Sequence, residues 1–350
     1  MDVDWKSVKR VLLVRLRSIG DTVLSTPSLI ALKRFLPDAQ IDILLEDWVA
    51  PILEGFEAVD DILTVGGGIT SRLAAAREIR RRKYDVVINI HGGTTATFFA
   101  AASGAPHRVG YSNYQYAFLY NHLLSSPSDF WKRDATHSAE QQLALLGFVG
   151  IPVDDRPKSR LAITDSATRS LNLKLSDAQI PSIELEKPFA IIHPIAASKT
   201  KEWDLEKFAR AAEFFNEKEI STIAVGTDDQ EQSLTRLRSL SGAPVHILTN
   251  LTLPELAAFA ARARVFVGND SGVAHIAAAV QTPSVVIFGS SNRDHWRPWT
   301  DAPNEVVFEQ FACQPCPGYE CKEFGEPLCI QTLGIEKVFA AIDRVLKASS

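Results

Sequence analysis

The sequence predicts an α/β protein built from two doubly wound domains that face a cleft. Three observations support this prediction. Short runs rich in Val and Ile alternate with segments of helical period, the alternation is interrupted once, and the 350 residues exceed the usual length of one domain. Alternation of strands and helices is typical of a parallel sheet covered by helices.

The first half of the chain contains five predicted strands separated by longer segments. Helices are predicted at 26–36, where the sequence reads TPSLIALKRFL, and at 71–83, where it reads SRLAAAREIRRRK. The strand segments are short and apolar, as buried strands are. These strands are predicted at 8–16, 40–46, 60–65, 84–89 and 107–111.

The alternation stops at 151–187, where Pro, Asp and Lys surround one short predicted helix, and this segment is the best linker candidate. We therefore expect domains at 1–175 and 176–350. The last helix, 335–348, is amphipathic and must dock on a core, for which the first domain is one candidate. Beyond the linker, strands are predicted at 188–194, 219–226, 244–248, 264–270 and 283–289, and helices at 205–217 and 253–262.

Charge and hydropathy exclude several classes of protein. The net charge of −5 does not favour nucleic-acid binding, which usually needs a basic protein. No apolar run reaches the roughly 18 residues that span a bilayer, and MDVDWKSVKR lacks a signal-peptide core, so a cytoplasmic protein is expected. Helix 71–83 is basic, which indicates either a solvated face or contact with an anionic membrane, such as the inner face of the inner membrane. Its basic residues are Arg72, Arg77, Arg80, Arg81, Arg82 and Lys83.

All four cysteines lie in one segment with the spacing C-x2-C-x4-C-x7-C. In a reducing compartment this cluster is compatible with zinc or an iron–sulfur cluster. The alternative is a set of free or pairing thiols that stabilise an irregular loop, and no metal is assigned from the spacing alone. The cysteines are Cys313, Cys316, Cys321 and Cys329.

Four polar segments follow predicted strands, where ligands of α/β sheets bind. The first, VRLRSIGDTVLSTP, has one glycine before Asp21, so it is not the dinucleotide fingerprint G-x-G-x-x-G. The second holds Ser198, Lys199 and Lys201, and the third has acids after Gly226. A phosphate suits the lysines, although surface cations are the ordinary alternative.

The fourth segment is GNDSGVAHIAAA, residues 268–279. A strand that turns through Asp270 and Ser271 into a helix directs several backbone N–H groups to one place, which favours an anion site. The alternative is that Asp270 or Ser271 caps its own helix.

These four segments, in this order, resemble the ADP-heptose lipopolysaccharide heptosyltransferases, glycosyltransferase family 9, whose fold is GT-B. The resemblance covers nearly the whole chain and implies a catalytic base at Asp21 in SIGD. It also implies donor contacts: Lys201 with the diphosphate, Asp228 or its neighbour Asp229 with the ribose, and Leu251 with the base. The D-T/S-G-x-x-H element of the family corresponds to Asp270, Ser271, Gly272 and His275.

One loop departs from the family pattern, because Ala196 and Ala197 leave only Ser198 as a hydroxyl for the phosphate. The resemblance implies an inverting, metal-independent enzyme that needs no cofactor and transfers heptose from ADP-heptose to a lipopolysaccharide core or related glycan. The C-terminal domain would bind the nucleotide sugar and the N-terminal domain the acceptor. A different nucleotide sugar, or a non-catalytic sugar-nucleotide-binding protein, is the alternative.

Acceptor contacts are expected at His91 and Arg108, with Lys132 and Arg133 as further cations for acidic sugars or lipid phosphates. His91 and His275 have the alternative role of structural histidines that are hydrogen-bonded inside the fold. The protein is expected to be a monomer and to bind no nucleic acid.

Overall fold

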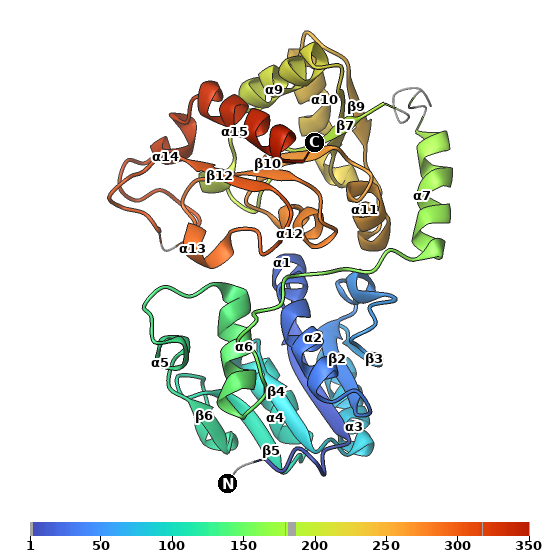
Figure 1. Cartoon of the computed structure of the whole chain (residues 1–350), viewed down its shortest axis with the longest axis vertical. Helices are drawn as coiled ribbons and strands as arrows, with labels where there is room; N and C mark the ends of the chain where they lie inside the picture. Colours follow the sequence, from blue (N-terminus) through green and yellow to red (C-terminus); the bar gives the residue numbers. More distant parts are fainter. Residues whose placement is uncertain (1–2, 179, 181–186, 317, 350) are drawn as a thin grey trace. The chain divides into compact units, whose positions relative to one another are not determined.

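The structure, a computed structural model, describes residues 3–178, 180, 187–316 and 318–349. Two compact units divide the chain, Met1–Ala162 and Ile163–Ser350. Each unit is built on one six-stranded parallel sheet packed with helices (Figure 1). The predicted α/β class with two doubly wound units is confirmed.

The sheet of the first unit has the strand order β3-β2-β1-β4-β5-β6. Its central strand carries the sequence RVLLVRL, and six of these seven residues are buried because helices cover both faces of the sheet. The strands are β1 Arg10–Leu16, β2 Gln40–Glu46, β3 Asp61–Val65, β4 Val86–Asn89, β5 His107–Tyr111 and β6 His122–Leu124.

The helices of the first unit connect these strands in the way that parallel pairing requires. One core cluster joins Leu12 and Val14 of β1 to Ile79 of α3 and Phe99 of α4. The helices are α1 Ile19–Val23, α2 Thr26–Phe35, η1 Ala50–Leu53, α3 Ile69–Arg82, α4 Gly93–Ala102, η2 Ala117–Leu119, α5 Pro127–Trp131 and α6 Ser138–Phe148.

The second unit repeats this topology with the order β12-β11-β10-β7-β8-β9. In each sheet the first strand of the unit lies beside the fourth, so the connections reverse direction at the pairs β1/β4 and β7/β10. Ligands of such sheets bind at this reversal, beyond the carboxyl ends of the strands. The strands are β7 Phe189–His193, β8 Ser221–Val225, β9 Val245–Leu248, β10 Val265–Asn269, β11 Ser284–Phe288 and β12 Asn304–Phe308.

The helices of the second unit pack on both sides of its sheet. Buried Trp203, Phe208 and Phe215 form the centre of one core cluster with the strands. The helices are α7 Asp165–Asp177, η3 Lys199–Lys201, α9 Leu205–Glu217, η4 Asp228–Gln230, α10 Glu231–Leu240, α11 Leu253–Ala260, α12 Gly272–Ala279, α13 Arg293–Trp296, α14 Leu328–Gln331 and α15 Ile335–Ala348.

The boundary between the units falls earlier than the expected 175/176. Helix α7 belongs to the second unit because Lys174 pairs with Glu255 of α11 at 2.7 Å and Ser170 donates a hydrogen bond to the same carboxylate at 2.6 Å. The expected linker is thus mostly outside α7, and its residues 181–186 lie outside the described part of the chain.

The last helix, α15, packs on its own unit. It contacts β11, β12 and α9, and Phe339 stacks on Phe214 of α9 with ring centroids 4.3 Å apart. Val338 and Ile342 are completely buried in the core of this unit. The first domain was one candidate for the core on which this helix docks, and its apolar face is instead occupied by the second unit.

Candidate active site

Four of the predicted site residues lie at the reversal points of the two sheets. In the first unit, Asp21 follows β1 and His91 follows β4, and these strands pair in register, with Val14 opposite Asn89. In the second unit, Lys201 follows β7 and Asp270 follows β10. Each unit therefore carries polar side chains where doubly wound sheets bind ligands.

Asp21 lies in the first turn of α1 but does not cap it. The N-cap residue is Ser18, whose hydroxyl donates to Oδ2 of Asp21 at 3.2 Å. The other carboxylate oxygen of Asp21 forms an ion pair with Arg15. Asp21 is half-buried, so its carboxylate is held in place and still accessible to a substrate.

Arg15 is a site residue that the sequence analysis missed. Its guanidinium is buried, and Nη1 donates to the carbonyl oxygen of Ile90 at 2.7 Å while Nη2 meets Asp21. Arg15 thereby links the loop after β1 to the loop after β4. The sequence RVLLVRL predicts a buried apolar strand. Nothing in this pattern indicates that the Arg15 side chain turns toward the site.

His91 is neutral in this environment. Burial, and then the positive charge of Arg15, lower the pKa of His91 to about 4. His91 lines a cavity of about 350 Å³ at the carboxyl edge of the first sheet. The cavity also includes Arg17, Glu46, Asp47, Trp48, Gly66, Gly67, Arg72 and Thr95.

In the second unit, Lys201 and Asp270 form an ion pair. Nζ of Lys201 lies 2.9 Å from Oδ2 of Asp270, and Ser291 donates a hydrogen bond to the same oxygen at 2.6 Å. Asp270 is buried, whereas Lys201 is half-buried. Asp270 is therefore not the cap of the following helix, whose N-cap residue is Ser271.

The N-cap residue of α12 is Ser271, and its side chain forms no capping hydrogen bond with the N–H groups of the first turn. The Ser271 hydroxyl instead lies 3.3 Å from Nδ1 of His193, at the end of β7. Burial lowers the pKa of His193 to about 4, so this imidazole is neutral. A helix N-terminus with Gly272 in its first turn and no side-chain cap is suited to an anion.

The loop after β7 is held by hydroxyl contacts. Ser198 lies 2.8 Å from the hydroxyl of Thr200, which in turn accepts a hydrogen bond from Ser290 at 2.9 Å. Lys199 is 89% exposed and pairs with Glu202, so it fits the description of a surface cation. Of the two lysines, only Lys201 turns toward Asp270.

Three other predicted donor residues lie along the same sheet. Asp228 and its neighbour Asp229 are both exposed in η4, directly after β8. Leu251 is half-buried after β9, next to the N-cap of α11. His275 is buried within α12.

The cations predicted for the acceptor lie elsewhere. Arg108 is near the amino end of β5, at the opposite edge of the sheet from Asp21 and His91. Its side chain donates hydrogen bonds to the carbonyls of Leu119 at 2.7 Å and Ala105 at 2.5 Å. Arg133 forms an ion pair with buried Glu140. Both guanidinium groups are therefore occupied by the fold itself.

The four cysteines line one small cavity of the second unit. All four are free thiols, and burial together with Cys313 raises the pKa of Cys316 to about 11. In the part of the chain that the structure describes, no group of three or more His, Cys, Asp or Glu side chains is already arranged to hold a metal ion.

Ser291 and His193 were also missed by sequence reasoning. Both stand directly at or after a strand end, Ser291 in the polar GSSN segment after β11 and His193 as the last residue of β7. The strand-end rule that selected the other segments would have selected these two as well.

Comparison with known proteins agrees with this arrangement. The model of glycosyltransferase family 9 (heptosyltransferase) matches residues 72–325. A lipopolysaccharide heptosyltransferase 3 of Escherichia coli is 26% identical over 96% of this chain and 98% of its own length.

Two solved structures share the fold. A glycosyltransferase family 9 protein of Veillonella parvula DSM 2008 has a TM-score of 0.82 at 20% identity, with 99% of both chains covered. The E. coli ADP-heptose LPS heptosyltransferase II has a TM-score of 0.78 at 19% identity, covering 97% of this chain and 98% of its own. With a family model that spans most of its length, the chain belongs to glycosyltransferase family 9, the heptosyltransferases.

Proposed function

We propose that this glycosyltransferase transfers a heptose from ADP-heptose to the core of lipopolysaccharide, with inversion of configuration at the anomeric carbon. The observation that carries the proposal is the pairing of polar groups at both reversal points: Asp21 with Arg15 in the first unit, and Lys201 with Asp270 in the second. The names of the relatives, which are lipopolysaccharide and ADP-heptose heptosyltransferases, supply the substrate class.

The strand order supports a nucleotide that lies along the second sheet. Strands β10, β7, β8 and β9 are consecutive neighbours, and they carry in turn Asp270, Lys201, Asp228 and Leu251. Neighbouring strands lie about 4.8 Å apart, so this row spans the length from a diphosphate through a ribose to a base. We assign diphosphate contacts to Lys201 and Ser271, the ribose to Asp228 and the adenine to Leu251.

The proposed reaction is a single displacement. An acceptor hydroxyl oxygen bonds to the anomeric carbon, the bond from that carbon to the diphosphate oxygen breaks, and Asp21 takes the hydroxyl proton. A carboxylate in this role contributes about 10²–10⁴-fold to the rate. Lys201 and the N-terminus of α12 stabilise the charge that develops on ADP, so we propose that the chemical step needs no added divalent metal.

We place the acceptor in the cavity of the first unit. Trp48 is 50% exposed there and offers a ring face to a sugar, while Glu46 and Asp47 offer carboxylates to its hydroxyl groups. Arg17 and Arg72 line the same cavity and suit a phosphate or carboxylate on an acidic core sugar. Neutral His91 offers a hydrogen bond without adding charge.

Helix α3 gives the first unit a candidate face for an anionic membrane surface. Ile69, Leu73 and Arg77 share one exposed side of the helix, with Arg80 one turn further on. No carboxylate in the described ranges forms an ion pair with Arg72, Arg77 or Arg80. Apolar and unpaired basic side chains on one helix face are typical of helices that lie on anionic bilayers.

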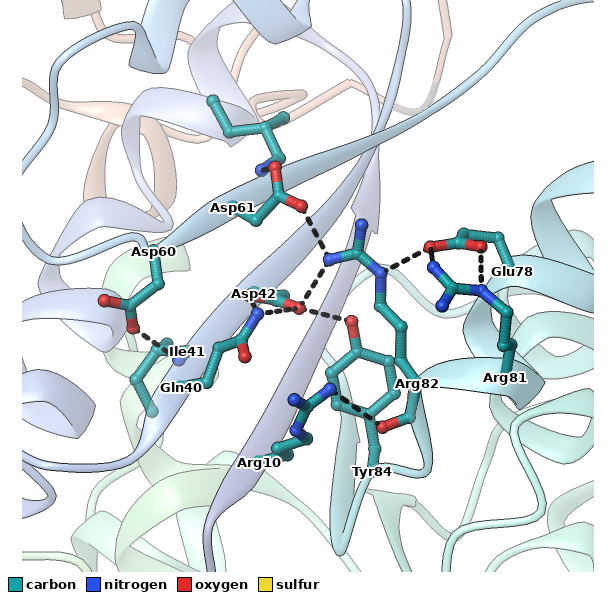
Figure 2. A network of polar contacts seen from close by, with 11 residues as sticks. Arg10, Gln40, Ile41, Asp42, Asp60, Asp61, Glu78, Arg81, Arg82 and Tyr84 are labelled. Carbon is teal, nitrogen blue, oxygen red and sulfur yellow. Dashed lines mark hydrogen bonds and ion pairs between the residues drawn. The ribbon is translucent and has the colours of Figure 1, made fainter.

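The opposite side of α3 is fixed to the sheet. Figure 2 shows Arg82 turned toward Asp42 and Asp61, with Glu78 reaching it from the preceding turn. The guanidinium lies 3.0 Å from Asp42, 2.6 Å from Asp61 and 2.8 Å from Glu78. Of the basic run in 71–83, Arg82 therefore serves the fold. Among the described helices, none is long and apolar enough to cross a bilayer.

The membrane assignment is tested by co-sedimentation with phosphatidylglycerol-containing vesicles. A double variant with Arg77→Glu and Ile69→Ser should bind several-fold more weakly than the unaltered protein, since each basic residue near such a surface contributes about 1 kcal/mol. Arg236→Glu, an exposed change in the second unit, is the control and should bind as the unaltered protein does. Equal binding of all three proteins would reject the α3 face.

The central experiment incubates the protein with ADP-heptose and a heptose-deficient core acceptor in buffer without Mg²⁺ or Mn²⁺. We expect mass spectrometry to show the acceptor one heptose heavier, and the anomeric configuration to be inverted by NMR. A modified nucleotide sugar with unchanged acceptor would indicate an epimerase instead. Binding of ADP-heptose with neither product would indicate a non-catalytic binding protein.

A further inference from the structure

The four cysteines surround a space that is sized for one ion. Their cavity has a volume of about 10 Å³, which leaves room for a single water molecule or ion. Two residues separate Cys313 from Cys316, and Cys316 donates its thiol hydrogen to the Cys313 carbonyl at 3.3 Å. The remaining walls are formed by Thr200, Ser290, Phe311, Phe324, Pro327 and Leu328.

The segment that carries the first three cysteines has, in its described residues, no regular secondary structure to fix its conformation. Between β12 and α14, the described residues 309–316 and 318–327 contain turns and bends but no helix or strand. Irregular segments of this length inside a compact unit are uncommon, and an ordered one usually has a function. The four thiols form no disulfide among themselves.

We propose that Cys313, Cys316, Cys321 and Cys329 bind one divalent transition-metal ion, zinc or ferrous iron, as a tetrahedral set of four thiolates. Four sulfur ligands in this geometry select these ions over magnesium or calcium. Each thiol releases its proton when the ion binds, so one ion displaces four protons. In this structure the four side chains are not arranged around an ion, so binding must bring their sulfur atoms closer together.

The cysteine cavity is adjacent to the loop that carries Lys201, because Thr200 of that loop lines the cavity. The backbone N–H of Cys316 donates to the Ser290 carbonyl at 2.9 Å, and the side-chain amide of Gln314 donates to the Gly289 carbonyl at 2.6 Å. Ser290 in turn donates through both its N–H and its hydroxyl to Thr200, the neighbour of Lys201.

The packing at this junction is tight. A Cβ added at Gly289 would stand 2.1 Å from the Thr200 carbonyl oxygen, so the backbones of the two loops are in close contact and leave no room for a side chain between them. The next residue along, Ser291, donates to Asp270. An ion at the cysteines therefore holds both partners of the Lys201–Asp270 pair in position, a coupling that depends on the proposed donor site.

Metal content is the first test. The full chain, purified under reducing conditions without added metal chelator, should carry about one zinc or iron per molecule by elemental mass spectrometry. Cys316→Ser and Cys329→Ser should each lose most of it, while Glu323→Gln, an exposed carboxylate in the same segment, should keep it.

A second measurement does not depend on whether the variants fold. Metal-free protein titrated with Co²⁺ should develop the visible absorption of tetrahedral cobalt thiolate with an end point at one equivalent. Absence of bound metal in the purified protein together with no cobalt spectrum would overturn the site. Disulfides among these cysteines in freshly purified protein would overturn it as well.

The coupling has its own test, ADP affinity by calorimetry. Metal-free protein should bind ADP at least tenfold more weakly than the metal-loaded form, and Lys201→Ala should leave the metal content unchanged. Equal ADP affinity with and without metal would overturn the coupling. Failure of the metal-loaded protein to bind ADP would instead overturn the proposed donor site.

Discussion

The ammonium group of Lys201 lies 2.9 Å from the carboxylate of Asp270, and this ion pair joins the two strands at which the connections of the second sheet reverse direction. Without a donor, each partner neutralises the other. A diphosphate must therefore compete with Asp270 for Lys201, and Asp270 becomes available to sugar hydroxyls when Lys201 turns to the phosphates.

Lys201→Ala should weaken ADP binding by roughly ten- to hundredfold, because it removes a charge-assisted contact that contributes about 1.5–3 kcal/mol. Lys199→Ala is the matched control: it removes an equal charge two residues away that pairs with Glu202 in solvent. Calorimetry with ADP should show a clear loss of affinity for Lys201→Ala and little loss for Lys199→Ala. Equal losses would mean that overall charge, and not the position of Lys201, governs binding.

Asp270→Asn should separate binding from turnover. The change releases Lys201 from its ion pair while keeping the hydrogen bond with Ser291, so ADP should bind at least as tightly as to the unaltered protein. Heptose transfer should fall, because an amide is a weaker acceptor for sugar hydroxyls than a carboxylate. Weaker ADP binding in this variant would show that Asp270 positions Lys201 and does not restrain it.

Asp21→Asn should reduce turnover by about 10²-fold or more, because the amide accepts no proton. The ADP affinity should stay unchanged, because the proposed donor contacts lie in the second unit. The melting temperature should fall only through the loss of the ion pair with buried Arg15, since Asp21 does not cap its helix. Steady-state rates with calorimetry and thermal unfolding on the same sample measure all three. Near-normal turnover would remove Asp21 from the role of base.

Arg15 should act as a positioning residue for Asp21. Arg15→Met should lower kcat with little change in the KM for ADP-heptose, and Arg15→Lys should restore part of kcat because the ammonium keeps a positive charge beside the carboxylate. A loss that Lys does not relieve, with a parallel fall in melting temperature, would assign Arg15 to packing alone.

The neutral histidines make the protein less stable in mild acid. In the unfolded chain the pKa of a histidine is about 6.5, whereas burial lowers that of His193 to about 4. Between these values the unfolded chain binds a proton that the folded one does not. The free energy of unfolding is therefore highest above about pH 6.5 and falls as the pH decreases toward 4, by roughly 3 kcal/mol at most for His193.

His193→Gln tests this dependence by urea unfolding between about pH 7 and pH 4.5. The variant should lose stability at neutral pH because its contact with Ser271 changes. Its stability should nevertheless depend less steeply on pH than that of the unaltered protein. Parallel curves for the two proteins would show that other groups control acid unfolding.

The charge network beneath α3 should contribute to stability through buried Asp42. Arg82→Met leaves this completely buried carboxylate with neutral donors only, Tyr84 at 2.5 Å and Gln40 at 3.1 Å, and should destabilise the first unit by about 3 kcal/mol. Arg81→Met is the control, since Arg81 is 73% exposed and should cost below about 1 kcal/mol. Urea unfolding of both variants measures the difference.

The fold was predictable because buried parallel strands are continuous apolar runs. All ten predicted strands are present, whereas β6 and β12 were missed: β6 has only three residues, and β12, NEVVF, is partly exposed and has no clear apolar run. The last helix was placed less well, since an amphipathic pattern reveals that a helix docks but not on which core.

The candidate site residues Asp21, Lys201 and Asp270 could be selected from the sequence because they follow predicted strands, and their roles stay predictions. Arg15 was missed because it lies within an apolar strand and points to the site only through a contact with a residue six positions later. Arg108 was selected for its charge, but charge does not reveal that it stands at the start of β5, where carbonyl groups bind it. Tertiary partners, and not residue type, decide both cases.

The docking of α7 on α11 determines where the donor-binding half can be separated as an independent polypeptide. A fragment that begins at residue 176 would lack Lys174 and Ser170, leaving the buried carboxylate of Glu255 without them and uncovering the surface under Leu171. A fragment that begins at Ile163 retains the whole helix. Its expression as a folded, ADP-binding protein would allow donor recognition to be studied without the acceptor half.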